Sequence, residues 1–275
     1  MPITWSMLRN PEPTSLAAAR ALAHRAAQWP TRAARANLEP AKDDSHSALV
    51  WDPNKAALLS QPLKGNIRVG LRVGVLELVF TKGADTEAFS LVTNTDAEVA
   101  EWLDGKLAQA GLKPACGAKL PYDMPPAGFA RAADEGPHLA ALAGWFAAGA
   151  EILEARRKKY KHFEPGPSRC WPHHFDIAMV VELDKKPKGK PARAIGIGLS
   201  PGDDYYAHPY FYLSPYPKPQ AENLPELPPG GRWHTREFFG AVATAVDLLA
   251  LPDPGAGLDK ILDVAFEECL KRLDV

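Results

Sequence analysis

Hydrophobic residues recur at every second position in several short stretches of the chain. In one of them Ile67, Val69 and Leu71 alternate with polar or small residues, and after Val75 the hydrophobic positions shift by one. A period of two is typical of a strand with one buried face, and a one-residue shift beside a glycine indicates a bulge or tight turn. The same alternation predicts strands over 46–52, 66–82, 88–93, 174–183, 193–200 and 209–214.

Between these stretches the hydrophobic residues recur at helical spacing. Thr95 and Glu98 fit a capping box at the start of one such segment. Pro30 is expected to end the first helix, because proline lacks the N–H that a helix interior needs. The predicted helices cover 12–29, 96–110, 137–159, 235–250 and 257–273.

This order of elements predicts an α+β fold in which antiparallel sheet packs on helices. We expect residues 1–275 to form a single compact domain, a size that one core can support. Each half of the chain shows strands followed by a helix. Two related strand-strand-strand-helix halves, 40–130 and 168–275, joined by the helix 137–159, are therefore an alternative organisation.

Composition and charge limit the classes of partner that we expect for the chain. Hydrophobic residues make up 46% of the chain and charged residues 24%, with a formal net charge of −1, which is ordinary for a soluble globular protein. A balance near zero gives no general attraction to nucleic acid or to an anionic membrane, so we expect neither as a partner. Two basic runs, 156–159 and 185–190, are expected to be a solvated helix end and an exposed loop.

The three cysteines are widely spaced, which favours free thiols over a disulfide framework or a thiolate zinc site. No secretory leader pattern and no apolar run long enough for a bilayer are visible, so a cytoplasmic location is expected. The oligomeric state is not predicted by any pattern in the chain.

The densest patch of reactive residues lies at 170–176. If the strand begins near Trp171, His173 shares the hydrophobic face with Phe175, while His174 and Asp176 stand two apart on the opposite face. On this interpretation His173 is a packed core histidine. His174 and Asp176 are then placed to share a proton, a ligand or a metal.

Pairing the hydrophobic faces of neighbouring strands sets their register. Ile177 should lie opposite Leu199, so that Asp176 faces Ser200 and His174 faces the turn at 202–204. On the third strand Tyr210 and Tyr212 should stand on the same face, beside Gly198. This arrangement predicts a shallow polar trough with an aromatic wall, and ligand-binding roles for Ser200, Asp203, Tyr210 and Tyr212.

Two classes of function fit this trough. In the first, the protein binds a small ligand or a metal, with hydrolysis as an open option: His174, Asp176, Asp204 and His208 offer two nitrogens and two carboxylates, a set suited to zinc or iron. Without a metal, His174 oriented by Asp176 would be the catalytic base. In the second, the protein is a non-catalytic structural or protein-interaction module whose His, Asp and Tyr cluster only stabilises the fold.

One stretch of the chain resembles a known family. The string Trp-Pro-His-His-Phe-Asp at 171–176, followed by Gly-x-Gly-x-Ser-Pro-Gly-Asp at 196–203 and His-Pro-Tyr-Phe-Tyr at 208–212, resembles an uncharacterised family of bacterial domains of unknown function. The resemblance covers about residues 168–217. It implies no activity, cofactor or substrate.

Overall fold

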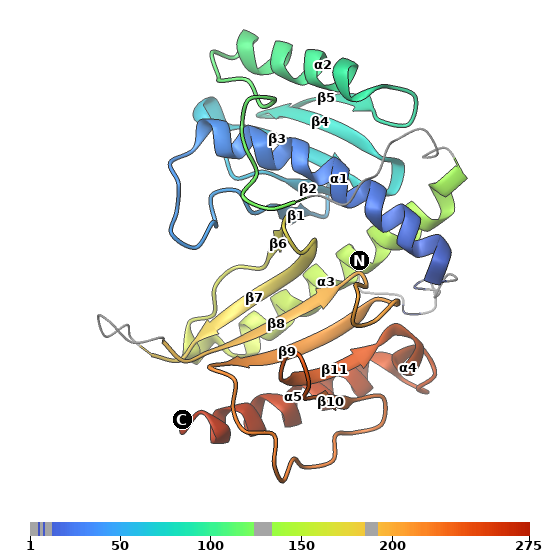
Figure 1. Cartoon of the computed structure of the whole chain (residues 1–275), viewed down its shortest axis with the longest axis vertical. Coiled ribbons are helices and arrows are strands. Elements are labelled where there is room, and N and C mark those ends of the chain that lie inside the picture. Colours follow the sequence, from blue (N-terminus) through green and yellow to red (C-terminus); the bar gives the residue numbers. More distant parts are fainter. Residues whose placement is uncertain (1–4, 6–7, 9–12, 124–133, 185–191) are drawn as a thin grey trace. The chain divides into compact units, whose positions relative to one another are not determined.

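The computed structural model describes residues 5, 8, 13–123, 134–184 and 192–275, and the side chains only from Leu16 within the first helix. The fold is α+β, with two antiparallel sheets of five and six strands (Figure 1). The helices are α1 (Pro13–Asn37), α2 (Asp96–Gln109), α3 (Gly136–Lys159), α4 (Ala245–Leu249) and α5 (Pro254–Arg272). The strands are β1 (Val50–Asp52), β2 (Ala57–Leu59), β3 (Ile67–Arg72), β4 (Glu77–Lys82), β5 (Asp85–Ser90), β6 (Arg169–Trp171), β7 (Asp176–Glu182), β8 (Ala194–Ser200), β9 (Tyr210–Tyr216), β10 (Arg232–His234) and β11 (Gly240–Thr244).

The contacts within the chain divide it into two compact units. The N-terminal unit comprises Pro11–Ala147 and Arg169–Phe175, and the C-terminal unit comprises Met1–Asn10, Ala148–Ser168 and Asp176–Val275. The boundary falls inside α3, which contributes its first half to one unit and its second half to the other.

The sheet of the N-terminal unit runs in the order β1-β2-β3-β4-β5, with each strand antiparallel to the next. The predicted shift of phase is a tight turn at Val73–Val75, where Leu76 adopts a left-handed conformation with φ of 50°. Ile67, Val69 and Leu71 are buried on the face on which α1 packs. The alternation therefore predicted both the strands and the break between them.

In this unit the predicted end of the first helix is wrong, and the predicted capping box of α2 is confirmed. The first helix does not end at Pro30 but continues to Asn37 with the proline inside it. Alanines on both sides of Pro30 are fully buried, so packing of the helix offsets the missing backbone hydrogen bond. The capping box of α2 is present, with the Glu98 amide donating to the Thr95 hydroxyl and the Thr95 amide to the Glu98 carboxylate.

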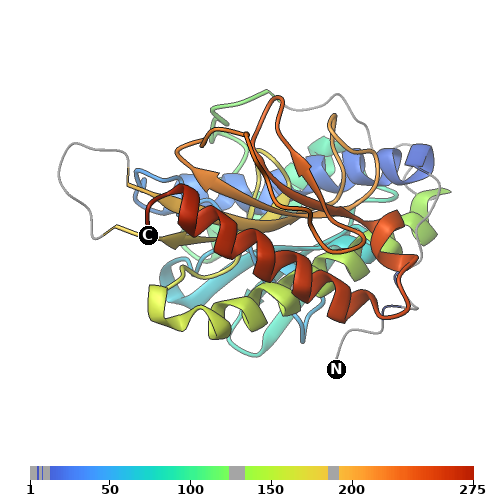
Figure 2. The same cartoon turned by 90° about the horizontal axis from the view of Figure 1, so that it is seen from below.

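In the C-terminal unit five strands follow the order β10-β11-β9-β8-β7. Ile177 pairs with Leu199 and Met179 with Ile197, as the matching of hydrophobic faces predicted. A Cβ at Gly149 of α3 would lie 2.9 Å from Ile177 and 3.2 Å from Leu199, so the helix approaches this face closely. Figure 2 shows α5 and the second half of α3 running along the sheet.

The predicted helix 235–250 is wrong over most of its length. The chain forms β11 there, and only the short helix α4 follows, capped by Thr244. A Cβ at Gly240 would lie 2.6 Å from the backbone oxygen of Leu213 on the neighbouring strand. Glycine at this position therefore permits the two strands to approach closely. The hydrophobic run alone does not distinguish such a strand from a helix.

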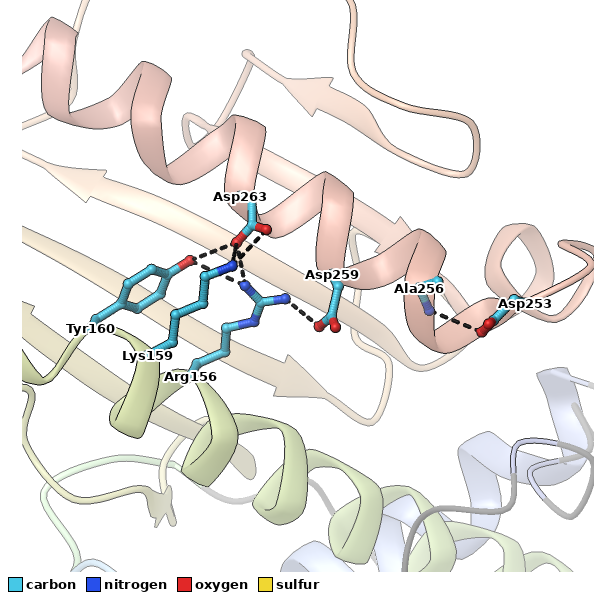
Figure 3. A network of polar contacts seen from close by, with 7 residues as sticks. All are labelled: Arg156, Lys159, Tyr160, Asp253, Ala256, Asp259 and Asp263. Atoms are coloured by element: carbon cyan, nitrogen blue, oxygen red, sulfur yellow. Dashed lines mark hydrogen bonds and ion pairs between the residues drawn. The ribbon is translucent and has the colours of Figure 1, made fainter.

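The basic run at the end of α3 is not simply solvated. Arg156 is 2% exposed and pairs with two carboxylates of α5, Asp259 and Asp263 (Figure 3). Asp263 also accepts from the Lys159 ammonium at 2.6 Å and from the Tyr160 hydroxyl at 3.5 Å. These contacts clamp α3 to α5. The second basic run, 185–190, lies outside the described residues.

Among the residues that the structure describes, no helix is both long and apolar enough to cross a bilayer.

Candidate functional site

One face of the C-terminal sheet carries the polar residues that the register predicted. Tyr212 pairs with Gly198 and Tyr210 with Ser200 in adjacent strands, so all four stand on the face opposite the α3 and α5 contacts. Asp176, one residue before Ile177 in β7, shares this face. Two predicted ligand-binding strands, β8 and β9, and the predicted catalytic Asp176 of β7 thus contribute to one face.

The expected trough is filled by a tyrosine ring. A Cβ at Gly198 would lie 2.5 Å from both the hydroxyl oxygen and the ring atom Cζ of Tyr212, so the ring crosses directly above the glycine. The Tyr212 hydroxyl donates to the carboxylate of Asp176, a residue that is 7% exposed. Burial, and then the charge of Asp176, raise the pKa of Tyr212 well above its usual value, so the hydroxyl keeps its proton.

Asp203 organises the loop that follows β8. One carboxylate oxygen accepts from the Tyr210 hydroxyl at 2.5 Å and the Ser200 hydroxyl at 3.1 Å, and the other from the backbone amides of Tyr205 at 2.9 Å and Tyr206 at 3.2 Å. A carboxylate has about four acceptor positions, so these four donors use its capacity. Burial, and then the bond to Asp203, raise the pKa of the Tyr210 hydroxyl. We call Asp203, Ser200 and Tyr210, with these two amides, the Asp203 cluster.

His173 and His174 do not lie on a strand. Residues 172–175 form a turn, closed by hydrogen bonds from the amides of His174 and Phe175 to the carbonyl of Trp171, and β7 begins only at Asp176. Both histidines are exposed, so the prediction that His173 is a packed core residue is wrong. The strand alternation that was the reason for pairing His174 with Asp176 does not apply either.

The reason for this turn lies in Phe175, which is fully buried with a φ of 58°. Its ring stacks on His24 of α1, with centroids 5.1 Å apart, and meets Phe146 at 5.0 Å. The carbonyl of Pro172 accepts from His24 Nε2 at 2.7 Å and from Gln28 Nε2 at 3.0 Å. Burial lowers the pKa of His24 despite its bond to Pro172, so this histidine is held neutral in the N-terminal unit.

The four predicted metal ligands come from three separate segments of the chain. Asp204 is exposed and His208 half-buried in the loop after β8, and His174 lies in the turn before β7. Throughout the described part of the chain, no group of three or more His, Cys, Asp or Glu side chains has the arrangement that a metal ion needs. The zinc or iron site predicted from His174, Asp176, Asp204 and His208 therefore gains no support from the described residues and stays a prediction.

A second polar arrangement on the same face involves residues that the sequence did not single out. His234 of β10 pairs with Gly240, and its imidazole contacts Tyr206 and Glu237. Its Nε2 lies 3.0 Å from the Glu237 carboxylate and its Nδ1 lies 3.0 Å from the Tyr206 hydroxyl. Because a carboxylate only accepts, Nε2 donates to Glu237, and Nδ1 of the neutral ring accepts from Tyr206. We call these three residues the His234 relay.

The surroundings of the relay are aromatic. The ring of Phe238 stacks on His234 with centroids 4.0 Å apart, and Tyr205 meets the imidazole edge-on at 5.7 Å. The guanidinium of Arg232 lies 5.8 Å from the centre of the Tyr206 ring. Burial raises the pKa of Tyr206, against the opposing charge of Arg232. A hydrogen bond from its own backbone amide, and then one from the His234 ring, lower the pKa of the Glu237 carboxyl.

The relay borders a surface hollow of about 390 Å³. Its lining combines rings with charged and polar groups: Asp204, Tyr205, Trp233, His234, Thr235, Arg236 and Glu237. The alternation Arg232-Trp233-His234 could have indicated a strand with His234 on the polar face, but the prediction of a helix from Thr235 obscured it.

The chain matches no model of a protein family, and neither a curated protein nor a solved structure proved similar to it. The resemblance of residues 168–217 to a bacterial domain family therefore stays a prediction.

Proposed function

We propose that the protein binds a small ring-bearing molecule in the hollow beside His234. The observation that carries the proposal is the His234 relay. An imidazole fixed at both nitrogens, stacked on Phe238 and set in the wall of a hollow, is preorganised for recognition of a ligand. Tyr205, half exposed, offers a ring face at the same hollow.

The charges of the lining favour a ligand with an amine. The lining contains two carboxylates, Asp204 and Glu237, and one guanidinium, Arg236. Asp204 makes no hydrogen bond or ion pair with another described residue, so its acceptor capacity is available to a ligand. An ammonium group near these carboxylates would also be attracted by the aromatic rings of the lining. A small aromatic amine meets all of these features.

Three probes with the same phenol ring test this proposal: tyramine, p-cresol and 4-hydroxyphenylacetate, which carry an ammonium, a methyl and a carboxylate. Binding would be followed by NMR at the Trp233 indole and the His234 ring. We expect tyramine to bind best and Asp204→Asn to weaken it several-fold, while Glu226→Gln, an exposed acid outside the hollow, leaves it unchanged. The proposal fails if none of the three probes shifts these signals.

A second candidate function is a non-catalytic module whose polar face serves the fold. The Asp203 cluster favours it, because all its hydroxyls and the carboxylate satisfy one another. The two candidates differ in one measurable respect. A purely structural role predicts that every polar residue of this face affects stability and none affects the binding of a small molecule.

A further inference from the structure

The second candidate site lies in the N-terminal unit, on a surface that the proposed function does not involve. A hollow of about 420 Å³ is lined by the β1–β2 hairpin and by the ends of β3 and β4. Its lining consists of Val50, Trp51, Asp52, Pro53, Asn54, Lys55, Leu59, Asn66, Arg68, Thr81 and Gly83. Its volume lies within the range of small-molecule sites, which is about 300–1,000 Å³.

Two cations, Arg68 and Lys55, lie along one row of side chains on this surface. Arg68 pairs with Thr81, and Thr81 with Thr86, so these three side chains stand in line across β3, β4 and β5. They lie on the face opposite Val69, the face that α1 does not cover. From the turn after β1, Lys55 extends to this row, where its ammonium lies 3.2 Å from the Thr86 hydroxyl.

Neither cation is neutralised. Among the described residues neither Lys55 nor Arg68 has an ion-pair partner, and Arg68 uses only Nη1, which donates to the Ser60 carbonyl at 3.1 Å. Arg72 provides the comparison, since it lies on the same strand and face and pairs with Glu77 at 3.2 Å. The sheet thus balances one of its two neighbouring arginines and leaves the other beside the hollow.

The one carboxylate in the lining is already engaged. Oδ1 of Asp52 accepts from the backbone amides of Asn54 at 2.9 Å and Lys55 at 3.1 Å, so it serves to fix the hairpin turn. The lining therefore has two cations against one carboxylate. The side-chain amides of Asn54 and Asn66 hold no partner among the described residues and can donate to a ligand.

We propose that this hollow binds a small molecule through an anionic oxygen group, a phosphate or a carboxylate, held between Arg68 and Lys55. A guanidinium presents paired N–H donors that match both groups, and the ammonium of Lys55 adds a second positive charge. The half-buried ring of Trp51 forms part of the wall beside the anion.

The experiment uses the full chain and two probes, inorganic phosphate and malonate, titrated at constant ionic strength with sodium chloride as the balancing salt, because screening changes with salt. NMR follows the Arg68 Nε and Trp51 indole signals. We expect saturable shifts, and Arg68→Gln and Lys55→Gln each to weaken binding by about tenfold, which corresponds to about 1.4 kcal/mol. Arg72→Gln, the matched control, should leave the affinity unchanged.

The two probes separate the sources of the anion: preferential binding of phosphate indicates a phosphorylated ligand, and preferential binding of malonate a carboxylate. Circular dichroism establishes whether each variant is folded. If Arg68→Gln is not folded, Lys55→Gln alone tests the proposal. The proposal is overturned if neither probe gives saturable shifts at these residues. It is equally overturned if Arg72→Gln weakens binding as much as Arg68→Gln, because the attraction would then be general rather than local.

Discussion

The Asp203 cluster and the His234 relay occupy the same face of the C-terminal sheet, yet they use their hydrogen-bonding groups differently. In the cluster the carboxylate receives two hydroxyls and two backbone amides, and Ser200 and Tyr210 are 4% exposed. In the relay the carboxylate is Glu237, whose side chain is 58% exposed, and the chain of contacts ends at a hollow.

This difference teaches how to separate stabilising from functional polar residues on one sheet. A buried group whose partners all come from the protein contributes to the free energy of folding, because removing it leaves other buried groups unsatisfied. A group with one satisfied side and one side toward a hollow contributes little to folding and is available to a ligand. Aspartate and tyrosine appear in both arrangements, so residue type alone does not distinguish them.

The largest loss of stability is expected at Asp203. Replacing Asp203 with alanine removes the acceptor of two hydroxyls and two amides, and we expect the free energy of unfolding to fall by about 3 kcal/mol. Asp204→Ala is the matched control, since the neighbouring side chain is exposed, and it should change stability by less than about 0.5 kcal/mol. Denaturant unfolding measures both, with the midpoint shifting at constant slope. Equal losses in the two variants would contradict the role of the cluster.

A smaller effect is expected where Tyr212 crosses Gly198. A methyl group at residue 198 would lie within 2.7 Å of the ring, and the bond of the hydroxyl to Asp176 restrains the ring from moving. Gly198→Ala should therefore lower the free energy of unfolding by about 2 kcal/mol through overpacking.

A double-mutant cycle isolates this contact. In a Tyr212→Ala background the added methyl group has space, so most of the penalty of Gly198→Ala should disappear. A penalty that persists in this background would mean that the glycine serves the backbone rather than the ring. Gly83→Ala is not a suitable control, because Gly83 has a φ of 61°.

Much of this face was predictable from the sequence. The alternation of Ile177 and Met179 and of Ile197 and Leu199 determined the register, because a slip by one residue would have exposed every hydrophobic side chain. The positions of Ser200, Tyr210 and Tyr212 on the opposite face followed from it. What alternation does not contain is the direction of each ring, so the expected open trough is in fact filled by Tyr212.

The sequence failed where tertiary packing outweighs local pattern. Nothing in the string around Phe175 indicates a positive φ, which is stabilised by contacts with His24 and Phe146, about 151 and 29 residues away in the chain. The run 238–244 is hydrophobic without a clear period, so a buried strand and a buried helix are equally compatible with it. Since β10 pairs with β11, the missed strand also concealed His234 and with it the relay.

The clamp between α3 and α5 supplies a second saturated carboxylate, Asp263, and its effect should depend on pH. Burial alone would raise the pKa of Asp263, but the bond from Lys159 and the charge of Arg156 outweigh it and lower the pKa. A lowered folded pKa stabilises the native state above the unfolded pKa of Asp, about 3.9, and this contribution disappears as the pH falls through the folded pKa.

We therefore expect Asp263→Asn to be less stable than the parent protein at pH 6, and the difference to narrow as the pH is lowered from about 4 to 2. Denaturant unfolding over this range measures the difference, and Glu267→Gln, an exposed neighbour on the same helix, is the control. A difference that does not vary with pH would show that the loss comes from packing rather than from the charge of Asp263.

The smallest effect on stability is expected at Glu237, and it is the most informative about function. Glu237 lies on the exposed side of the relay, and exposed ion pairs contribute little to folding. Glu237→Gln should therefore leave the unfolding midpoint unchanged, as should the control Glu226→Gln. A carboxylate at residue 237 only accepts, so it requires His234 Nε2 to carry the proton. The amide of Glu237→Gln both donates and accepts, so this requirement is lost.

Nitrogen NMR of the imidazole should accordingly show one neutral tautomer, protonated at Nε2, in the parent protein and a mixture of tautomers in Glu237→Gln. The variant should also bind tyramine more weakly. A fall in stability like that of Asp203→Ala, with the tautomer unaltered, would place the relay in the same class as the Asp203 cluster and leave the hollow without its orienting group.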